Sequence, residues 1–484
     1  MCSAILSRRR LLTGSASLAA AFGVGEIASY WPEQALGHGV NALTGPALPQ
    51  FRANAETAPA LAERFPWVQY GEATSHKLQI ANAFKPGIGF ESAPTEGRLG
   101  EREFTIGSRA VIPWAPMFER PSVIFRANRE LQSLAGVEQL FIKDEGSDLV
   151  AIYGNKVRKY EFLLPNLHYS GVRKIYSHGA YGSNHCAHLA LTGRFAEFHS
   201  GPRSEGMDVV LNLYPQAITE NVVTKLRLLS ATGVTLNFMQ GDAVVGVSIK
   251  MLSLMNQTTK RSAEGYIDPG GSSPLSVLGH VEAAMELAQQ IESGSCELNR
   301  YPDYVFLPIG TGGTAMGLAL GFYLLGWPTR VVVTCSQDKS SLAKLVVNGD
   351  IGAPFDIAHA CHLLEESLPW ARKLGLVEDD ITPAKILKGR LFYDNETWLP
   401  AYGKMNKRVA ERAGLANDLG LVLDGTFSAK AFDTLGSFAE RGLLKNKRIL
   451  FWNTYQRFPF ETILPQDDAW AKYLPEDVQS RLFT

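Results

Sequence analysis

Short apolar runs alternate with amphipathic runs through most of the chain after residue 109. Runs rich in Val, Ile, Leu and aromatic residues have the length of buried β-strands, and they occupy residues 139–145, 174–179, 208–214, 304–310 and 330–336. Residues 221–233 and 280–291 instead repeat apolar side chains at the three- and four-residue spacing of amphipathic helices. This alternation predicts an α/β fold with parallel sheets covered by helices.

The region before this alternating part has a different texture. Residues 31–105 contain stretches of Pro, Gly and Ala with little sustained periodicity, apart from a short helical pattern at residues 58–65. We interpret residues 31–105 as an N-terminal extension that packs on the core or on a partner subunit.

The first thirty residues have the features of an export signal. Arg8 and Arg9 precede two leucines and a small, apolar run to Gly25, and the first acidic residue is Glu26. The apolar run is too short for a comfortable membrane span, and the paired arginines are typical of a twin-arginine signal. We therefore expect residues 1–30 to direct export to the periplasm, with no stable membrane span after cleavage. Cleavage anywhere from about residue 20 to 40 and retention as an anchor both remain open.

Composition narrows the class of protein. The chain has 484 residues, 45% of them hydrophobic and 20% charged, with a formal net charge of −1. This length allows a large core in two or three lobes. The near-neutral balance gives no electrostatic reason to expect a nucleic-acid partner, so small metabolites are the more natural ligands.

Cysteine and histidine spacings favour neither a disulfide framework nor a metal site. After Cys2 in the predicted signal, Cys186, Cys296, Cys335 and Cys361 have no close pairing spacing. A metal site is one interpretation of His178, His185, Cys186 and His188, because residues 185 and 188 could share a helix face. However, no C-x-x-C or H-E-x-x-H spacing is present. We predict no metal.

One basic turn suggests cofactor chemistry. GNKVRK, residues 154–159, is a glycine-asparagine turn that brings Lys156 to the first turn of a predicted helix, with Lys159 three residues further on the same face. A helix start collects backbone N–H groups and positive potential. An anionic cofactor could sit there beside an amine that binds it covalently.

Three more segments add polar turns to this one. Residues 176–191 read as a strand, a turn and a helix, which places Ser183 and Asn184 at the carboxyl end of the strand, where α/β sheets bind ligands. Residues 304–322 read as a buried strand, the glycine-rich turn GTGGT and a helix, so this turn can wrap a phosphate with its N–H groups. Residues 267–287 offer a Gly-Gly-Ser-Ser turn before a helix.

In that order, the four segments resemble the fold-type II pyridoxal-phosphate enzymes, and most closely the 1-aminocyclopropane-1-carboxylate deaminase and D-cysteine desulfhydrase family of the tryptophan synthase β-like superfamily. The resemblance covers roughly residues 110 to 460. It implies a two-lobed α/β fold with pyridoxal 5'-phosphate between a large lobe, residues 106–161 and 266–484, and a small lobe, residues 162–265. It also implies a small amino-acid substrate and a homodimer.

The resemblance assigns roles to individual residues. Lys156 is implied as the lysine that holds the cofactor covalently, and Lys159 as a lysine beside the phosphate. Ser183 faces the substrate, and Asn184 donates or accepts a hydrogen bond at the hydroxyl of the cofactor ring. The phosphate loop consists of Gly310, Thr311, Gly312, Gly313 and Thr314.

Near the C-terminus the chain departs from the family pattern. The family commonly has L-D-P-V-Y followed by Thr or Glu, and this chain has LDGTFSAK at residues 423–430. Phe427 therefore replaces a tyrosine whose hydroxyl can take part in proton transfer, and Ser428 stands where the partner of the pyridine nitrogen belongs. Tyr455 and Gln456 add bulk where the family has glycines. Ser428 could alternatively be the N-cap of a helix.

The expected activity follows from these roles. We expect a lyase or deaminase in which Lys156 removes the α-proton of an amino acid, Ser183 and Asn184 orient the substrate and ring, and a β-substituent leaves to give a 2-oxo acid and ammonia. A hydroxyl partner makes the ring a weak electron sink, which favours β-elimination over opening a cyclopropane.

Two alternatives remain at this point. GTGGTA, residues 310–315, also fits a dinucleotide-binding fingerprint, with Asp338 after the next strand, and would indicate an oxidoreductase. Phe427 and the altered FWNTYQ segment instead allow a pseudoenzyme that retains the cofactor pocket without turnover.

Overall fold

The computed structural model describes the following residues: 50–52, 104–106, 108–110, 121–146, 154–169, 171–195, 207–216, 218–238, 263–335, 357–373, 376–394, 403–462, 464, 468–474 and 476–482. The predicted export signal and the helical pattern at residues 58–65 lie outside them. A search of the described helices finds none that is long and apolar enough to cross a membrane.

The described strands form two main sheets. The first has six strands in the order β12-β11-β10-β13-β5-β4, and the second has five in the order β1-β8-β7-β6-β9. Within each sheet the pairs are parallel, except that β4 runs antiparallel to β5 and β1 antiparallel to β8. The strands of the six-stranded sheet are β4 (Val123–Arg126), β5 (Leu140–Asp144), β10 (Tyr304–Ile309), β11 (Arg330–Cys335), β12 (Leu391–Asp394) and β13 (Ile449–Asn453). Those of the five-stranded sheet are β1 (Gln50–Arg52), β6 (Lys174–Ala180), β7 (Asp208–Tyr214), β8 (Thr235–Phe238) and β9 (Glu264–Tyr266), and β2 (Phe104–Ile106) pairs only with β3 (Ser108–Ala110).

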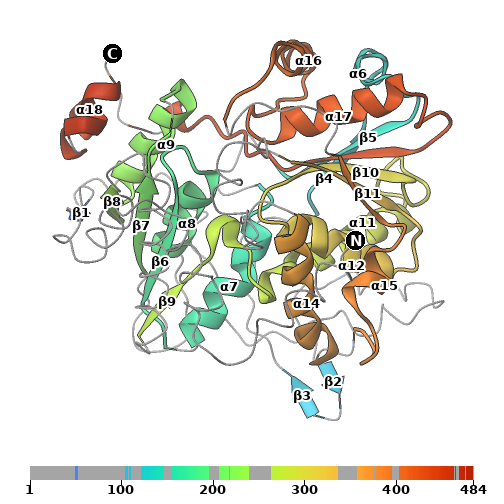
Figure 1. Cartoon of the computed structure of the whole chain (residues 1–484), viewed down its shortest axis with the longest axis horizontal. Helices are drawn as coiled ribbons and strands as arrows, with labels where there is room; N and C mark the ends of the chain where they lie inside the picture. Colours follow the sequence, from blue (N-terminus) through green and yellow to red (C-terminus); the bar gives the residue numbers. More distant parts are fainter. Residues whose placement is uncertain are drawn as a thin grey trace, which may run out of the picture.

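Helices cover both sheets (Figure 1). The α-helices are α6 (Arg129–Ala135), α7 (Val157–Tyr169), α8 (Asn184–Phe195), α9 (Glu220–Ala231), α11 (Leu278–Glu292), α12 (Gly313–Leu324), α14 (Ile357–Lys373), α15 (Pro383–Leu387), α16 (Lys407–Asp418), α17 (Ser428–Glu440) and α18 (Glu476–Leu482). Short 3-10 turns occupy η2 (Pro269–Gly271), η3 (Leu275–Val277), η4 (Phe460–Thr462) and η5 (Asp468–Tyr473). Figure 1 shows β6 to β9 with α8 and α9 on one side, β10 and β11 with α11 and α12 on the other, and α7 between them.

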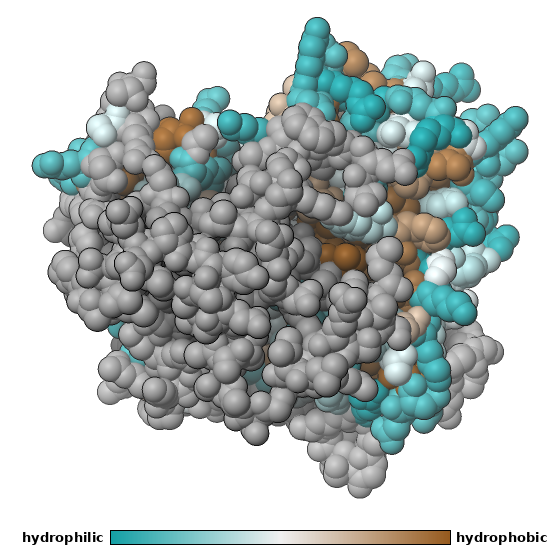
Figure 2. All heavy atoms as spheres, viewed as in Figure 1, coloured by the Kyte–Doolittle hydropathy of each residue, from teal (hydrophilic) through white to brown (hydrophobic). Residues whose placement is uncertain are grey.

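The predicted fold class is confirmed, because the apolar runs of the sequence form parallel strands with helices between them. Residues 330–335 (RVVVTC), for example, form β11, whose interior residues are buried. The β-branched side chains of Val pack well on a pleated surface that is covered on both faces. The surface is more hydrophilic than the strands. In the face drawn in Figure 2, most residues over α16 and α17 are hydrophilic, and hydrophobic residues show between them and in a recess below.

Glycines let α12 pack very closely on α11. A Cβ atom at Gly317 would lie 2.5 Å from the Cβ of His280, and one at Gly321 would lie 2.5 Å from the Cβ of Ala284. Because these two glycines are four residues apart, they form one smooth stripe on α12. The contact fixes the position of the start of α12, and therefore of the glycine-rich turn before it.

The lobe boundaries stay predictions. Apart from β1, the strands of the five-stranded sheet lie between residues 174 and 266, close to the range predicted for the small lobe. The boundary placed after residue 161 falls inside α7. From the predicted extension, β1 joins the same sheet through β8.

Candidate active site

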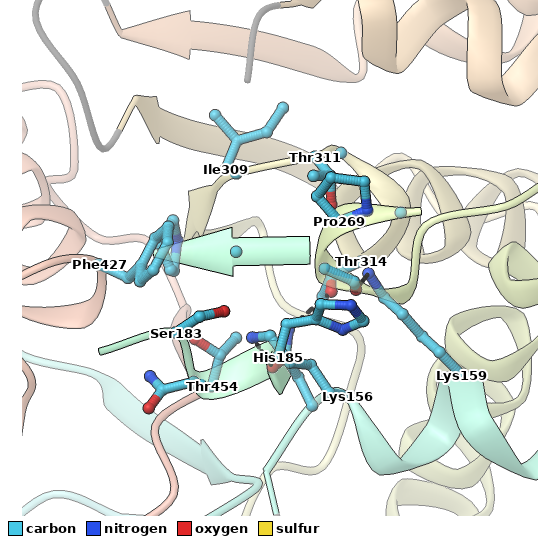
Figure 3. Close-up of a pocket in the computed structure, with 18 of the residues that line it drawn as sticks. Lys156, Lys159, Ser183, His185, Pro269, Ile309, Thr311, Thr314, Phe427 and Thr454 are labelled. Carbon is cyan, nitrogen blue, oxygen red and sulfur yellow. Dashed lines mark hydrogen bonds between the residues drawn. The ribbon is translucent and has the colours of Figure 1, made fainter. Parts of the chain in front are cut away.

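One cleft collects nearly every residue that the sequence singled out. Lys156, Lys159, Ser183, Asn184 and the loop Gly310–Thr314 all line it. They come from both sheets: β6 ends just before the Ser183 turn, and β10 ends just before the glycine loop. In Figure 3, Lys156, His185 and Thr314 lie near the centre, with Phe427 on one side and Lys159 on the other.

Lys156 is held by the turn before α7. Gly154 has a φ of 109°, which favours glycine, and its N–H donates to the carbonyl of Glu145 at 2.6 Å. The Lys156 Nζ donates to Asn155 Oδ1 at 3.3 Å. Burial lowers the pKa of Lys156 to about 8, although the charge of Asp424 opposes this shift. At pH 7 roughly a tenth of the amine is therefore neutral and nucleophilic, far more than for an ordinary lysine.

The glycine loop and Lys159 form a cradle for an anion. Gly312 has a φ of 89° and is the N-cap of α12, so the loop presents backbone N–H groups at the positive end of a helix. Opposite the loop, Lys159 Nζ donates to Ser272 Oγ at 2.8 Å and to the carbonyl of Gly270 at 2.9 Å. Burial and the nearby Lys156 hold the pKa of Lys159 well below its usual value. A bound phosphate would supply the negative charge that favours the protonated lysine.

Two observations show that this cradle fits a phosphate and a hydroxyl-bearing ring. A Cβ atom at Gly313 would lie 2.8 Å from Ser272 Oγ and 2.9 Å from Lys159 Nζ, so the cradle leaves room for a ligand only because residue 313 has no side chain. The Oδ1 atom of Asn184, which also lines the cleft, is buried without a hydrogen-bond partner in the described structure. A ring hydroxyl would satisfy this acceptor.

We predict that Gly313→Ala weakens cofactor binding by roughly tenfold or more, the equivalent of about 1.4 kcal/mol. The new methyl group would enter the space between Lys159 and Ser272. Residue 313 has no positive φ and begins a helix, where alanine is favourable, so folding should tolerate the change. Titration of the cofactor-free protein with pyridoxal phosphate measures the affinity. Gly414→Ala on α16, where a Cβ atom would meet nothing within 4 Å and φ is not positive, is the control. Unchanged affinity in Gly313→Ala would argue against the cradle.

Gly312 is a poorer place for this test. A Cβ atom there would lie 2.5 Å from the Cβ of Ala360 on α14, and the φ of 89° is strained for any other residue. Substitution of Gly312 by valine would therefore damage packing as well as the loop.

Ser183 lies at the start of α8, directly over β6. A Cβ atom at Gly179 would lie 2.7 Å from Ser183 Oγ, so the absence of a side chain at residue 179 lets the serine approach the strand. Ser183 Oγ accepts the N–H of Cys186 at 3.2 Å. This bond leaves the hydroxyl proton available to a ligand, beside the positive end of α8.

Ser428 lies outside the cleft lining, and its hydroxyl is occupied. It donates to Asp424 Oδ1 at 2.7 Å and accepts the N–H of Asp424 at 2.7 Å. The Asp424 carboxylate also accepts the N–H groups of Thr426, Phe427 and Ser428, so Asp424 satisfies the start of α17. The N-cap interpretation of Ser428 is wrong, because Ser428 is the first helical residue and Phe427 is the N-cap. A contact between Ser428 and the pyridine nitrogen stays a prediction. The Ser428 hydroxyl would have to give up its bond to Asp424 and rotate toward the ring.

A family model described as "Pyridoxal-phosphate dependent enzyme" matches residues 117–454, about 70% of the chain. The chain belongs to this family. The predicted cofactor, pyridoxal phosphate, is thereby confirmed. That it binds in the cleft lined by Lys156 stays a prediction.

A curated protein and several solved structures are similar to most of the chain. A curated protein of Pyrococcus abyssi, provisionally named 1-aminocyclopropane-1-carboxylate deaminase, is 27% identical over 351 residues, which are 71% of this chain and 90% of the relative. The crystal structure of an ACC deaminase homologue matches 71% of this chain and 91% of its own, with a TM-score of 0.52 and 23% identity, and so supports the fold. Threonine deaminase isoform 2 of Solanum lycopersicum matches 69% of this chain and 84% of its own at 15% identity, with a TM-score of 0.44. The predicted resemblance to the ACC deaminase group is confirmed.

The alternatives gain no support from these comparisons. The glycine loop lies in a pyridoxal-phosphate enzyme, so the dinucleotide interpretation of GTGGTA is not needed, and Asp338 lies outside the described residues. No group of three or more His, Cys, Asp or Glu side chains suited to a metal ion occurs among the described residues. His185 instead bonds Tyr160 and Ser177 inside the protein.

Sequence reasoning missed other residues that line the cleft or hold its lining in place. Asp424 lines the cleft and acts electrostatically on Lys156. Ser272 holds Lys159 and also bonds Thr311 at 2.5 Å, and Asn155 donates to Thr314 Oγ1 at 2.9 Å. The Gly-Gly-Ser-Ser turn and the asparagine of GNK were visible signals, but their partners lie 39 to 159 residues away along the sequence.

A buried charge network anchors the helix that follows Lys156. Arg158 on α7 bonds Glu145 at 2.9 Å and Glu286 on α11 at 2.9 Å, and Lys143 on β5 bonds Glu286 at 2.6 Å. All four side chains are at most 4% exposed. Burial alone would lower the pKa of Arg158, but the two carboxylates raise it above its usual value. Charge balance in this network fixes α7 against β5 and α11.

We predict that Phe427→Tyr changes the rate or the substrate preference at little cost in stability. Phe427 is only half-buried and faces the cleft, with its ring centroid 5.9 Å from Lys156 Nζ, so an added hydroxyl would meet ligand or water. Melting temperature and 2-oxo acid release should be measured side by side. If the variant instead loses roughly 1 to 3 kcal/mol without a kinetic change, Phe427 is core packing and its proposed place in the site is wrong.

Proposed function

We propose that this pyridoxal-phosphate-dependent enzyme is a lyase or deaminase that removes a β-substituent from a small amino acid and releases a 2-oxo acid and ammonia. The observation that carries the proposal is the buried amine of Lys156, with a pKa lowered to about 8, between an anion cradle and the Ser183 hydroxyl. The provisional name of the Pyrococcus relative supports the same class of reaction.

We assign a task in this reaction to each cleft residue that the sequence predicted. The cradle of Gly310–Thr314 and Lys159 would hold the cofactor phosphate, and Asn184 would bond the ring hydroxyl. When bound, pyridoxal phosphate links covalently to an amine and withdraws electron density from the bonds at Cα. Lys156 would then accept the α-proton at Nζ, because its lowered pKa leaves the amine neutral often enough to act as a base. Ser183 and the start of α8 would orient the substrate carboxylate.

The leaving group decides between elimination and ring opening. The bond between Ser428 and Asp424 uses the serine proton, and Phe427 offers no hydroxyl. Residues 427 and 428 therefore supply no free hydroxyl proton, which favours substrates whose β-substituent departs readily, such as a thiol or an activated hydroxyl. We therefore place D-cysteine desulfhydrase-like elimination ahead of cyclopropane deamination.

A substrate screen tests the proposal. The holoenzyme should be offered D- and L-cysteine, D- and L-serine, 1-aminocyclopropane-1-carboxylate and further β-substituted amino acids, with 2-oxo acid and ammonia both measured. We expect release from at least one β-substituted amino acid, and none from the Lys156→Ala variant. Cofactor binding without turnover across the whole panel would instead favour a pseudoenzyme.

We also propose that the protein is exported by the twin-arginine pathway, on the basis of Arg8, Arg9 and the apolar run after them. Changing both arginines to lysine should leave the protein in the cytosol, because the pathway reads the pair as an address and not as charge. Cell fractionation with an antibody measures the result. Continued export of the double variant would indicate a general secretion signal or an anchor.

The expected homodimer is a further proposal, since it comes from the family resemblance. Light scattering of the purified holoenzyme would test it against the chain mass of 53.0 kDa. A monomer mass at micromolar concentration would contradict the proposal.

A further inference from the structure

His178 has an unusual environment near the carboxyl end of β6. Its side chain is only 3% exposed, and the residue lines the same cleft as Lys156 and Ser183. The Nδ1 atom lies 2.5 Å from the Tyr266 hydroxyl, and the two rings stack with centroids 5.7 Å apart at 25°. Tyr266 therefore fixes both the position and the orientation of the imidazole.

The other ring nitrogen of His178 has no protein partner. Nε2 is buried, and no hydrogen bond to it is found in the described structure. His185, in the same cleft, differs: its Nδ1 bonds Tyr160 at 2.6 Å and its Nε2 bonds Ser177 at 2.7 Å. Buried polar atoms in proteins are nearly always paired, so an unpaired nitrogen that lines a ligand cleft points to a ligand atom.

The tautomer of His178 follows from its one partner. Burial lowers the pKa of His178 to about 3, so the ring is neutral and carries a single N–H. If Tyr266 donates to Nδ1, only the Nε2–H is unsatisfied. If Nδ1 donates instead, both the Nε2 lone pair and the tyrosine proton are left without partners. The first arrangement satisfies more groups, so Nε2 is a donor that faces the cleft.

The position of His178 indicates which part of a ligand it reaches. The phosphate cradle follows β10 in the six-stranded sheet, whereas His178 belongs to the five-stranded sheet, on the strand that leads to Ser183. The cofactor phosphate has partners in the cradle, the amine of an amino acid would bind the cofactor in place of Lys156, and its carboxylate has a partner in Ser183. The remaining acceptor of such a substrate is its side chain.

We propose that His178 is a specificity-determining residue that donates a hydrogen bond from Nε2 to an acceptor on Cβ of the substrate, such as a hydroxyl or a thiol sulfur. This inference rests on the proposed function, because it requires an amino-acid substrate. It implies that the site prefers substrates with a polar β-substituent over those with an alkyl group.

Two ligands that differ by one hydroxyl test the proposal. Both α-methylserine, as separate enantiomers, and 2-aminoisobutyrate lack an α-proton, so neither can undergo α-proton removal. Each is titrated into the holoenzyme, and the dissociation constant is read from the change in cofactor absorbance. We expect one enantiomer of α-methylserine to bind about three- to tenfold more tightly than 2-aminoisobutyrate, the range of one net hydrogen bond.

Variants assign this preference to His178. His178→Phe keeps a ring of similar size without the N–H, and it should bind both ligands equally, with the affinity for 2-aminoisobutyrate unchanged. His178→Gln retains a donor and should recover part of the preference. Tyr266→Phe, which leaves the imidazole but removes its partner, should reduce the preference without abolishing it.

The outcomes separate the inference from the proposed function. An unchanged preference in His178→Phe, or no preference in the wild-type protein, would overturn the role of His178 while amino-acid binding stands. An equal loss for both ligands would show that His178 supports the pocket or the cofactor and does not read the substituent. If no amino acid changes the absorbance of the wild-type protein, the proposed function itself fails.

Discussion

Replacing Lys156 by alanine should abolish the covalent attachment of the cofactor and lower turnover by several orders of magnitude. The variant loses both the anchoring amine and the proposed base, and a positioned base alone contributes a factor of about 10² to 10⁴. The phosphate cradle of Lys159 and Gly310–Thr314 is untouched, so pyridoxal phosphate should still bind noncovalently. Borohydride reduction followed by mass spectrometry measures the attachment, and absorbance near about 410 nm follows it in the wild-type protein.

Two other buried lysines provide the controls for this prediction. Lys159 lies in the same cleft, and Lys225 on α9 also has a pKa lowered to about 8 by burial. Lys159→Ala should weaken phosphate binding but keep the reducible link, and Lys225→Ala should keep it too. A borohydride-stable adduct in Lys156→Ala, mapped to residue 159 or 225, would show that the wrong lysine was chosen.

Arg158→Met should destabilise the protein by about 3 to 5 kcal/mol, the usual effect of removing one partner from a buried ion pair. Glu286 would keep Lys143, but Glu145 would lose its guanidinium partner inside the protein. The uncompensated carboxylate, more than the lost attraction, accounts for the cost. Urea unfolding of the cofactor-free protein, followed by circular dichroism, measures the change.

The matched control for this prediction is Arg448→Met. Arg448 also pairs with a carboxylate, that of Asp303 at 3.4 Å, but both side chains are partly exposed. Because solvent screens such pairs, this variant should lose much less stability than Arg158→Met. Equal losses in the two variants would mean that the network around Arg158 contributes no more than a surface pair.

Much of the fold could be predicted from hydrophobic patterns in short segments of the sequence. The apolar runs at residues 139–145 and 208–214 correspond to β5 and β7 within one residue at each end, and the helical spacing at residues 221–233 corresponds to α9. Period and length are properties of short segments, so they can be read without knowledge of the partners. The turns that carry Lys156, Ser183 and the glycine loop were predicted for the same reason.

Most side-chain contacts of the site could not be predicted from short segments of the sequence. The bond between Ser428 and Asp424 joins residues only four positions apart, yet the sequence offered two roles for Ser428 and did not show that this bond engages its hydroxyl. The pairing of Arg158 with Glu286 joins residues 128 positions apart, and the contact of His178 with Tyr266 joins residues 88 apart. Such contacts depend on how helices and strands pack, and the strand order in each sheet was equally invisible.

The position of β13 in its sheet determines how late in synthesis the six-stranded sheet can form. β13 is the last strand along the chain, yet it lies between β10 and β5 and pairs with both. Until residues 449–453 leave the ribosome, both neighbours have unpaired edges, and the sheet remains open at its centre. Tyr455, which lines the cleft, arrives later still. A chain truncated before residue 449 would therefore lack a continuous large sheet, and the cleft has its complete lining only after residue 455 has been synthesised.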